Sequence, residues 1–315
     1  MEQKLAFSPA PSRRLGRSLG INNIPPKVCP YACGYCQLGR TIKMQIERQA
    51  FYAPEEILKA VREKVNSAQA AGESIDYLTF VPDGEPTLDL NLGRAIELLK
   101  SLGLPIAVIT SAALIWHEEV RAALSQADWV SLKMDAAREE VWRRINRPYG
   151  TLQLSAILDG ALKFVAGFKG QLVTETMLVE GLNDGPALLE ETASFVAQLQ
   201  LDTAYLSIPT RPPAEGWGQP PNEAVINQAY QVFSDRVEHV EYLIGYEGNA
   251  FAFTGNIEDD LLSITAVHPM REDAVNQLLT QAQATWPVVQ RLMAQGQLIE
   301  TKYKHQKFYL RRIHS

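Results

Sequence analysis

The residues of this sequence that could do chemistry together are its three cysteines, which lie within eight positions of one another. Cys29, Cys33 and Cys36 have the spacing CxxxCxxC, in a loop after a predicted strand. An odd number of cysteines this close together argues against a disulfide framework, which would leave one thiol over. Three thiolates from one tight loop can instead ligate three irons of a 4Fe-4S cubane and leave the fourth iron open to a substrate.

The main alternative for the three thiols is a structural zinc ion with a histidine as its fourth ligand. Structural zinc is tetrahedral and usually takes paired CxxC knuckles or a nearby histidine pair. Neither pattern occurs here, so the cluster is the favoured interpretation. The histidines that zinc would have to use are His117, His239, His268, His305 and His314.

A second motif follows the apolar run at residues 77–81. It reads Asp83-Gly84-Glu85-Pro86-Thr87, a glycine-proline turn with two carboxylates. On its own such a turn does no more than end a strand.

The elements that must position these motifs are repeated βα units. Short β-rich runs alternate with amphipathic helical stretches from residue 20 to about residue 210, which predicts a parallel sheet covered by helices. Helices are expected to begin near Pro54, after Asp89, near His117 and at Pro186, and another is expected over residues 224–233. The functional site of a βα barrel lies at the C-terminal ends of its strands. The six strand candidates are residues 19–23, 77–81, 106–110, 129–134, 172–179 and 205–208.

Taken together, the two motifs resemble those of the radical S-adenosylmethionine (SAM) superfamily. Its CxxxCxΦC signature has an aromatic residue before the last cysteine, here Tyr35, and its GGEP motif is similar to residues 83–86, with Asp83 in place of the first glycine. The resemblance implies a partial (β/α)6 TIM-type barrel and one 4Fe-4S cluster on the three cysteines. It also implies SAM as cofactor, bound to the open iron and split into methionine and a 5'-deoxyadenosyl radical.

The same resemblance implies which side chains bind SAM. Gly84, Glu85 and Pro86 would receive the methionine ammonium, together with backbone carbonyls of that stretch. Ser111 stands where the family often contacts the ribose, Lys133 and Asp135 point into the same mouth beyond a strand, and Val179 opens a segment near the adenine. Ordinary polarity at strand ends is the alternative for these later positions. The complete set of predicted cofactor-binding residues is Tyr35, Gly84, Glu85, Pro86, Ser111, Lys133, Asp135 and Val179.

Two further stretches, SRRLGRSLGINN and YCQLGRT, are similar to a radical SAM subfamily related to the wyosine-type tRNA-modifying enzymes. Those enzymes carry additional N-terminal cysteines for a second cluster, and no cysteine precedes Cys29, which argues against that particular reaction. The arginines of these stretches could hold an anionic substrate or could pin the loop to the acidic body. They are Arg13, Arg14, Arg17 and Arg40.

The C-terminal stretch reads as a separate unit. Three helices and a hairpin after residue 256 predict a small winged-helix-like domain at 257–315, which follows a barrel at 1–256 in the chain. Its hairpin interleaves basic and aromatic residues, which suits contact with RNA or docking to a protein, although any half-buried strand alternates in this way. Residues 1–50 carry a net charge of +6 and residues 296–315 of +4, against −16 for the remainder.

The composition, with 46% hydrophobic residues, is ordinary for a globular protein. The first residues lack a basic-then-apolar signal pattern, and no apolar run reaches the roughly 18 residues of a membrane span, so we expect a cytoplasmic protein. The sequence therefore predicts a radical SAM enzyme that takes an electron from a donor such as flavodoxin or ferredoxin. Its substrate would be RNA, a peptide or protein, or a small molecule. A different class of function also fits: a non-catalytic iron-sulfur regulator that binds DNA.

Overall fold

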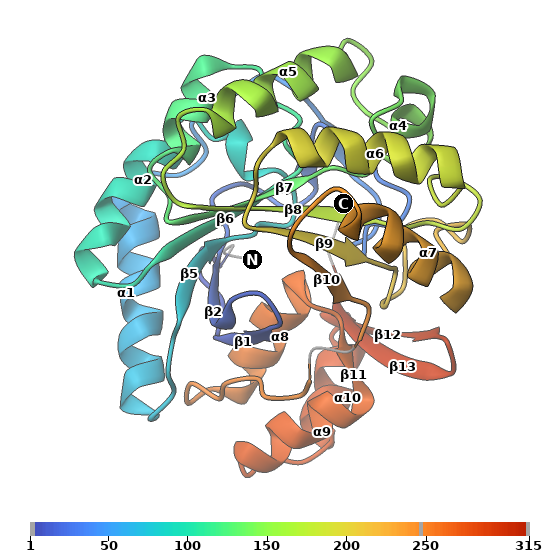
Figure 1. The fold of residues 1–315 in the computed structure, drawn as a ribbon. Coiled ribbons are helices and arrows are strands. Elements are labelled where there is room, and N and C mark those ends of the chain that lie inside the picture. Colours follow the sequence, from blue (N-terminus) through green and yellow to red (C-terminus); the bar gives the residue numbers. More distant parts are fainter. Residues whose placement is uncertain (1–3, 246–247, 313–315) are drawn as a thin grey trace.

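A curled eight-stranded sheet forms the centre of the molecule (Figure 1). The computed structural model describes residues 4–245 and 248–312. Strand β1 (Ala10–Ser12) lies at one edge and pairs with its neighbour antiparallel; the other strands are parallel and follow one another in chain order. These parallel strands are β2 (Gly16–Ile21), β5 (Tyr77–Phe80), β6 (Ile106–Thr110), β7 (Trp129–Lys133), β8 (Gln171–Met177), β9 (Thr203–Ser207) and β10 (Val240–Leu243).

Helices cover the outer, convex face of this sheet in an arc (Figure 1). Pro54 opens the first of them, with Glu55 and Glu56 in the first turn, and Asn222 caps the last by accepting from the backbone N–H of Val225. The predicted partial barrel is therefore confirmed, and β10, a further strand that the sequence also predicts at about residues 237–245, lies beside its six strands. The covering helices are α1 (Pro54–Ala70), α2 (Leu92–Leu99), α3 (Glu118–Leu124), α4 (Glu139–Ile145), α5 (Leu154–Val165), α6 (Pro186–Gln198) and α7 (Glu223–Ser234). The 3-10 turns Pro86–Leu88 and Lys100–Leu102 lie between them.

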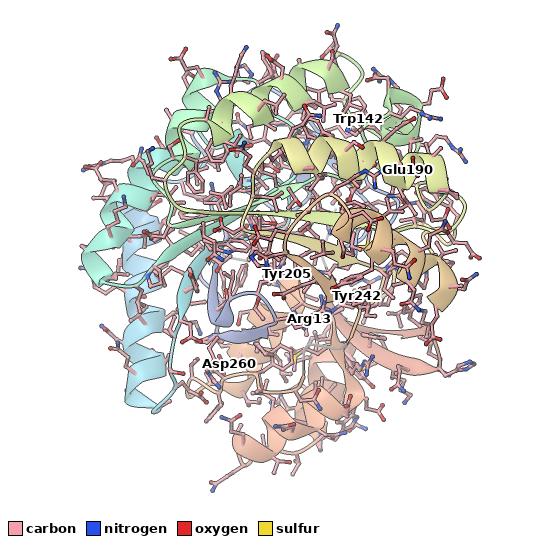
Figure 2. The ribbon with its side chains drawn as sticks, in the orientation of Figure 1. Arg13, Trp142, Glu190, Tyr205, Tyr242 and Asp260 are labelled. Atoms are coloured by element: carbon pink, nitrogen blue, oxygen red, sulfur yellow. The ribbon has the colours of Figure 1, made fainter. Side chains whose placement is uncertain are left out.

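The two faces of the sheet carry different residues because side chains alternate along a strand. On β7, Val130 and Leu132 belong to the large core beneath the helices, whereas Trp129 packs with Val173 and Tyr205 in a smaller cluster. Figure 2 shows Tyr205 on the inner side of the curl. Apolar residues thus fill part of the barrel interior, and the remaining inward positions are polar.

A second unit follows the barrel. Its helices are α8 (Ile257–Val267), α9 (Glu272–Gln281) and α10 (Pro287–Ala294), and its antiparallel sheet has the order β11 (Met270–Arg271), β13 (Gln306–Arg311), β12 (Leu298–Tyr303). The predicted three helices and hairpin are present, and the short strand β11 is an addition. Phe251 already packs in the core of this unit. The winged-helix identity and the boundary at residue 257 stay predictions.

The second unit lies against the side of the sheet opposite the helical arc (Figure 1). Asp260 of α8 is completely buried and accepts hydrogen bonds from Ser8 and from the backbone and hydroxyl of Thr254. The ammonium of Lys64, on α1, lies 3.6 Å from the same carboxylate. These contacts tie α8 to the N-terminal segment and to the barrel. No helix among the described residues is long and apolar enough to cross a membrane.

Candidate active site at the mouth of the barrel

The cysteine loop leaves the sheet after β2 and is held by its own short ladder. Cys29 belongs to β3 (Val28–Cys29), which pairs in parallel with β4 (Lys43–Met44). Within the loop, the N–H of Cys36 donates to the carbonyl of Cys33 at 3.1 Å. All three thiols are partly buried. The loop is therefore a folded turn that carries all three cysteines.

Asn146, the residue that follows α4, supports the loop from behind. Its side-chain nitrogen lies 3.4 Å from the sulfur of Cys33 and donates to Asp135 at 2.7 Å. Asp135 also accepts hydrogen bonds from the hydroxyl of Tyr35 and, at 2.9 Å, from the backbone N–H of Met177. The aromatic residue of the cysteine motif is thus fixed by a buried carboxylate from the end of β7.

Gly84 brings the second motif directly against the cysteine loop. Its φ is +153°, and a Cβ here would lie 2.2 Å from the carbonyl oxygen of Val28, next to Cys29. The N–H of Glu85 donates to that same oxygen at 3.1 Å. Because only glycine tolerates both the φ and the close approach, this position locks the two motifs together through the backbone.

Asp83, which replaces the family's first glycine, has a partner of its own. Its carboxylate lies 2.8 Å from the ammonium of Lys27, and both side chains are buried. Burial raises the pKa of Asp83 to about 6, although Lys27 acts in the opposite direction. Lys27 also donates to the carbonyl of Leu38 on the far side of the cysteine loop. The substitution therefore adds an ionic brace across the loop.

The carboxylate of Glu85 is 1% exposed and accepts five hydrogen bonds. One oxygen accepts from the backbone and hydroxyl of Thr87 and from the hydroxyl of Thr110; the other accepts from the backbone and hydroxyl of Ser111 at 2.7 and 2.6 Å. Glu85 thereby ties the turn after β5 to the end of β6.

A cavity of about 280 Å³ opens where these strand ends meet. Cys36 lines it, and so do five of the eight predicted cofactor-binding residues. They are Tyr35, Gly84, Glu85, Ser111 and Lys133. Residues that lie far apart in the sequence are thus brought to one wall, beside the cysteine loop.

The other three predicted residues do not line this cavity. Pro86 accepts a hydrogen bond from the side chain of Asn23 through its carbonyl, at 3.0 Å. Val179 is buried beside Tyr35, and its N–H donates to Asn183 at 2.9 Å. Asp135 lies behind Tyr35, as described above. These residues support the wall of the cavity from outside.

An ionic network crosses the interior just below the mouth. Glu175 of β8 accepts from Lys133 at 2.9 Å, from Ser207 at 2.9 Å and from the guanidinium of Arg14. Burial alone would raise the pKa of Glu175, but Lys133 and Arg14 hold that pKa well below its usual range. Burial would lower the pKa of Lys133, but the carboxylates of Asp135 and Glu175 outweigh it and raise that pKa. Lys133 is therefore a fixed ammonium, 5.0 Å above the ring of Tyr35.

The four arginines that bracket the cysteine loop divide between the two predicted roles. Arg13 and Arg14 line the cavity. Arg17 instead pairs with Glu73, and Arg40 with Glu215, so these two pin loops to acidic residues.

The cysteine loop holds no ready-made site for a single ion. Within residues 4–245 and 248–312, no group of three or more His, Cys, Asp and Glu side chains lies close enough together to hold one metal ion. His314, one of the histidines that a zinc site could use, lies outside the described residues. Burial raises the pKa of all three thiols, that of Cys33 to about 12, so metal binding must displace their protons.

Several residues of the site were not predicted from sequence. Asn146 follows a seven-residue helix that has no side-chain cap to mark its start. Glu175 does leave a signal, a carboxylate inside an otherwise buried strand. Trp217 packs so closely over the cysteine loop that a Cβ on Gly34 would lie 1.8 Å from its ring, yet it comes from a proline-rich loop without periodicity.

Comparison with known proteins identifies the family and the fold. The profile of the radical SAM superfamily matches residues 23–195. The UPF0026 protein MJ1312 of Methanocaldococcus jannaschii is 44% identical over 313 residues, which cover 99% of this chain and 97% of that protein. Among solved structures, TYW1 with a lysine-pyruvate adduct bound has a TM-score of 0.55 at 15% identity, covering 70% of this chain and 74% of that one. A radical SAM methyltransferase from Sphaerobacter thermophilus has the same TM-score at 17% identity, covering 72% and 66%. These last two show a shared fold. The relative places the chain with the UPF0026 proteins. The profile, which matches more than half of the chain, shows the superfamily: the chain belongs to the radical SAM superfamily and is a radical SAM enzyme.

Proposed function

We propose that Cys29, Cys33 and Cys36 hold one 4Fe-4S cluster and that SAM occupies the cavity at the mouth of the barrel. When bound, the cluster supplies the electron that splits SAM into methionine and a 5'-deoxyadenosyl radical, which takes a hydrogen atom from the substrate. The observation that carries the proposal is the meeting of Cys36 with Gly84, Ser111 and Lys133 in a single cavity.

The residues of the cavity divide the work of binding. Because the carboxylate of Glu85 is already taken by five donors, backbone carbonyls of the turn at Gly84 would receive the methionine ammonium, and Glu85 would hold that turn in place. Ser111 would face the ribose. Lys133 stays protonated beside Glu175 and would bind a carboxylate or phosphate oxygen, without acting as a base.

Anaerobic reconstitution tests this proposal. Reduced, iron-loaded protein incubated with SAM should release 5'-deoxyadenosine, measured by liquid chromatography and mass spectrometry. Cys33→Ala should lose both the cluster absorbance and the product. Met44→Ala, an exposed position on β4 beside the loop, should keep both. Intact absorbance without 5'-deoxyadenosine in the wild-type protein would refute SAM cleavage.

RNA is a second candidate as the substrate, because the basic hairpin lies beside the mouth. The hydroxyl of Tyr303, at the end of β12, donates to the carbonyl of Pro209, which lines the cavity. Lys307 is engaged by Glu272 at 3.0 Å, and the other basic residues of the hairpin are Lys302, Lys304, Arg311 and Arg312. If the hairpin grips RNA, Lys302→Glu with Lys304→Glu should weaken RNA retention at low salt, and Lys169→Glu, on the barrel surface, should not.

The electron donor would be a flavodoxin or ferredoxin, and the protein would act in the cytoplasm. The rival function, a DNA-binding iron-sulfur regulator, predicts duplex binding that changes when the cluster is reduced. A gel-shift assay on the oxidised and reduced protein distinguishes the two functions, because SAM cleavage does not require such a change.

A further inference from the structure

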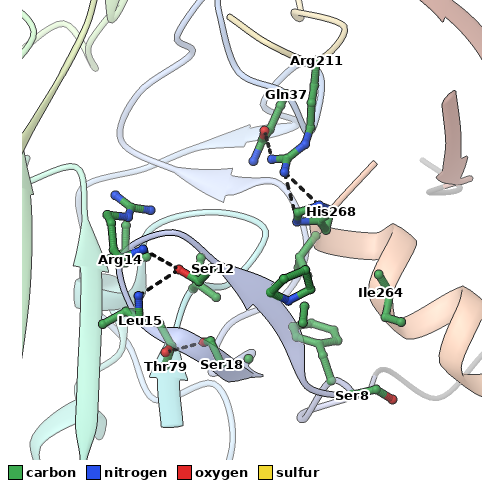
Figure 3. A pocket seen from close by; sticks show the side chains of 17 residues that line it. Ser8, Ser12, Arg14, Leu15, Ser18, Gln37, Thr79, Arg211, Ile264 and His268 are labelled. Carbon is green, nitrogen blue, oxygen red and sulfur yellow. Dashed lines mark hydrogen bonds between the residues drawn. The ribbon is translucent and has the colours of Figure 1, made fainter. Parts of the chain in front are cut away.

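A second cavity, of about 120 Å³, lies deeper in the barrel (Figure 3). Three parts of the chain enclose it: the N-terminal hairpin β1–β2, the inner face of β5 and β6, and helix α8 of the C-terminal unit. Ile264, Val267 and His268 are the contribution of the C-terminal unit. The second unit therefore forms one wall of the barrel interior.

This inner cavity adjoins the one at the mouth. The two share five lining residues: Arg14, Gln37, Val81, Ile109 and Arg211. Gln37 is the residue after Cys36, and its side-chain oxygen accepts from the guanidinium of Arg211. A molecule in the inner cavity would therefore lie next to SAM in the mouth, which is where the hydrogen donor of the proposed reaction has to be.

The permanent charges at the inner cavity are two guanidinium groups. Among the described residues that line it are Arg14 and Arg211, and no aspartate or glutamate, although Arg14 also pairs with Glu175 of the mouth. Figure 3 shows the guanidinium of Arg211 between Gln37 and His268, whose Nε2 lies 2.8 Å from it. Arg211 is only 8% exposed. Guanidinium groups bind carboxylate and phosphate in a fork, and more strongly where water is excluded.

The rest of the lining sets the size and character of the ligand. Apolar groups from Leu15, Val81, Ile109 and Val267 surround the space, and the hydroxyls of Ser18 and Thr79 bond to each other at 2.7 Å. The volume is somewhat below the roughly 150 Å³ of an engineered cavity that holds benzene. A space of this size matches a compact organic acid and is too small to hold a nucleic-acid strand or a folded peptide as a whole.

We propose that the inner cavity is the substrate site and that it takes a small organic anion with an apolar body, positioned by Arg211 and Arg14 and enclosed by α8. The assignment of this anion as hydrogen donor rests on the proposed SAM cleavage. The existence of an anion-binding site in the inner cavity does not depend on SAM cleavage. The C-terminal unit is then part of the active site.

Binding is tested first, on reconstituted oxidised protein with SAM, by saturation-transfer NMR with butyrate and its neutral analogue butyramide. Butyrate should bind about tenfold more tightly, the equivalent of one charge-assisted hydrogen bond. Val267→Phe, which fills the cavity from α8, should abolish the butyrate signal. Val288→Phe, a half-buried valine of α10 outside the cavity, should leave it unchanged. Equal binding of butyramide, or a butyrate signal that survives Val267→Phe, would overturn the anion site.

Deuterium transfer then tests the role of the anion. The reduced enzyme is given SAM and, separately, the anionic small-molecule fraction, the neutral fraction or the RNA from cells grown in heavy water. The share of 5'-deoxyadenosine that carries deuterium should rise only with the anionic fraction and should fall at least tenfold in Val267→Phe. Deuterium from RNA or from the neutral fraction, or none from the anionic fraction, would refute the assignment. If no SAM is cleaved, the proposed function fails, and the NMR result still decides the anion site because it needs no turnover.

Discussion

The contact between the cysteine loop and the turn at Gly84 can be tested by adding one methyl group. In Gly84→Ala the new Cβ would lie 2.2 Å from the carbonyl oxygen of Val28, so that oxygen or the turn must move by about 1 Å. Overpacking of this kind costs about 1–3 kcal/mol, in addition to about 1–2 kcal/mol for a side chain at positive φ. Gly39 is the matched control, because its φ is +88° and nothing lies within 4 Å of its added Cβ. Gly39→Ala should lose only the about 1–2 kcal/mol of stability that a side chain at positive φ costs.

These free energies translate into melting temperatures. At about 2.1 cal/mol/K of unfolding entropy per residue, a chain of 315 residues loses about 1.5 °C for each kcal/mol. Thermal unfolding of the iron-free protein, followed by circular dichroism, should therefore show a loss of about 5 °C for Gly84→Ala and about 2 °C for Gly39→Ala. Gly84→Ala should also take up less iron, because the displaced oxygen belongs to the residue before Cys29. Equal melting temperatures for the two variants would refute the close approach of the motifs.

Three further variants probe the braces around the site. Burial raises the pKa of Asp83 to about 6 in the folded protein, so protonation of this carboxyl stabilises the fold. This stabilisation is fully present below the pKa that Asp83 has in the unfolded chain, and it is lost as the pH rises through about 6. Urea unfolding should therefore show Asp83→Asn gaining about 1 kcal/mol relative to wild type between pH 5 and pH 7, and a constant difference would contradict the raised pKa. Asp260→Ala removes a buried carboxylate that accepts three hydrogen bonds and leaves Lys64 behind, so it should cost about 3–5 kcal/mol and make the C-terminal unit more sensitive to proteolysis. Its neighbour Asp259, half exposed and paired with Lys4, should cost at most about 1 kcal/mol when changed to alanine. Asp135→Asn should release Tyr35 and Asn146 and speed the loss of iron to a chelator several-fold, whereas an unchanged rate would show that this carboxylate does not stabilise the loop.

The parts of the site that could be predicted are those fixed by local rules. The cysteine spacing needs one loop, Gly84 needs one turn, and the order of βα units places both at strand ends. The resemblance to the radical SAM superfamily adds Ser111 and Lys133, which line the cavity with Cys36. Asp135 and Val179 follow from the same resemblance but lie behind the cavity, because a strand end also carries the residues that support its neighbours.

Contacts between distant segments could not be predicted in this way. Arg211 and His268 are 57 positions apart, and they meet only because α8 closes the open side of the curled sheet. Arg14 reaches Glu175 across the barrel, 161 positions away. No local pattern records such a pairing, since each residue on its own resembles ordinary surface polarity. The same reasoning explains why the anion cavity has no signature in the sequence.

The position of the C-terminal unit bears on the choice between an enzyme and a DNA-binding regulator. A regulator has to present its reading surface to a duplex and needs only a linkage to the cluster. Here α8 is buried against the N-terminal segment through Asp260, and His268 at its end reaches the inner cavity. Moving this unit to meet a duplex would expose the buried carboxylate of Asp260 and open the cavity beside Gln37. Burial of this kind favours a unit that stays in place during function, and a unit that encloses a cavity beside the cysteines serves an enzyme.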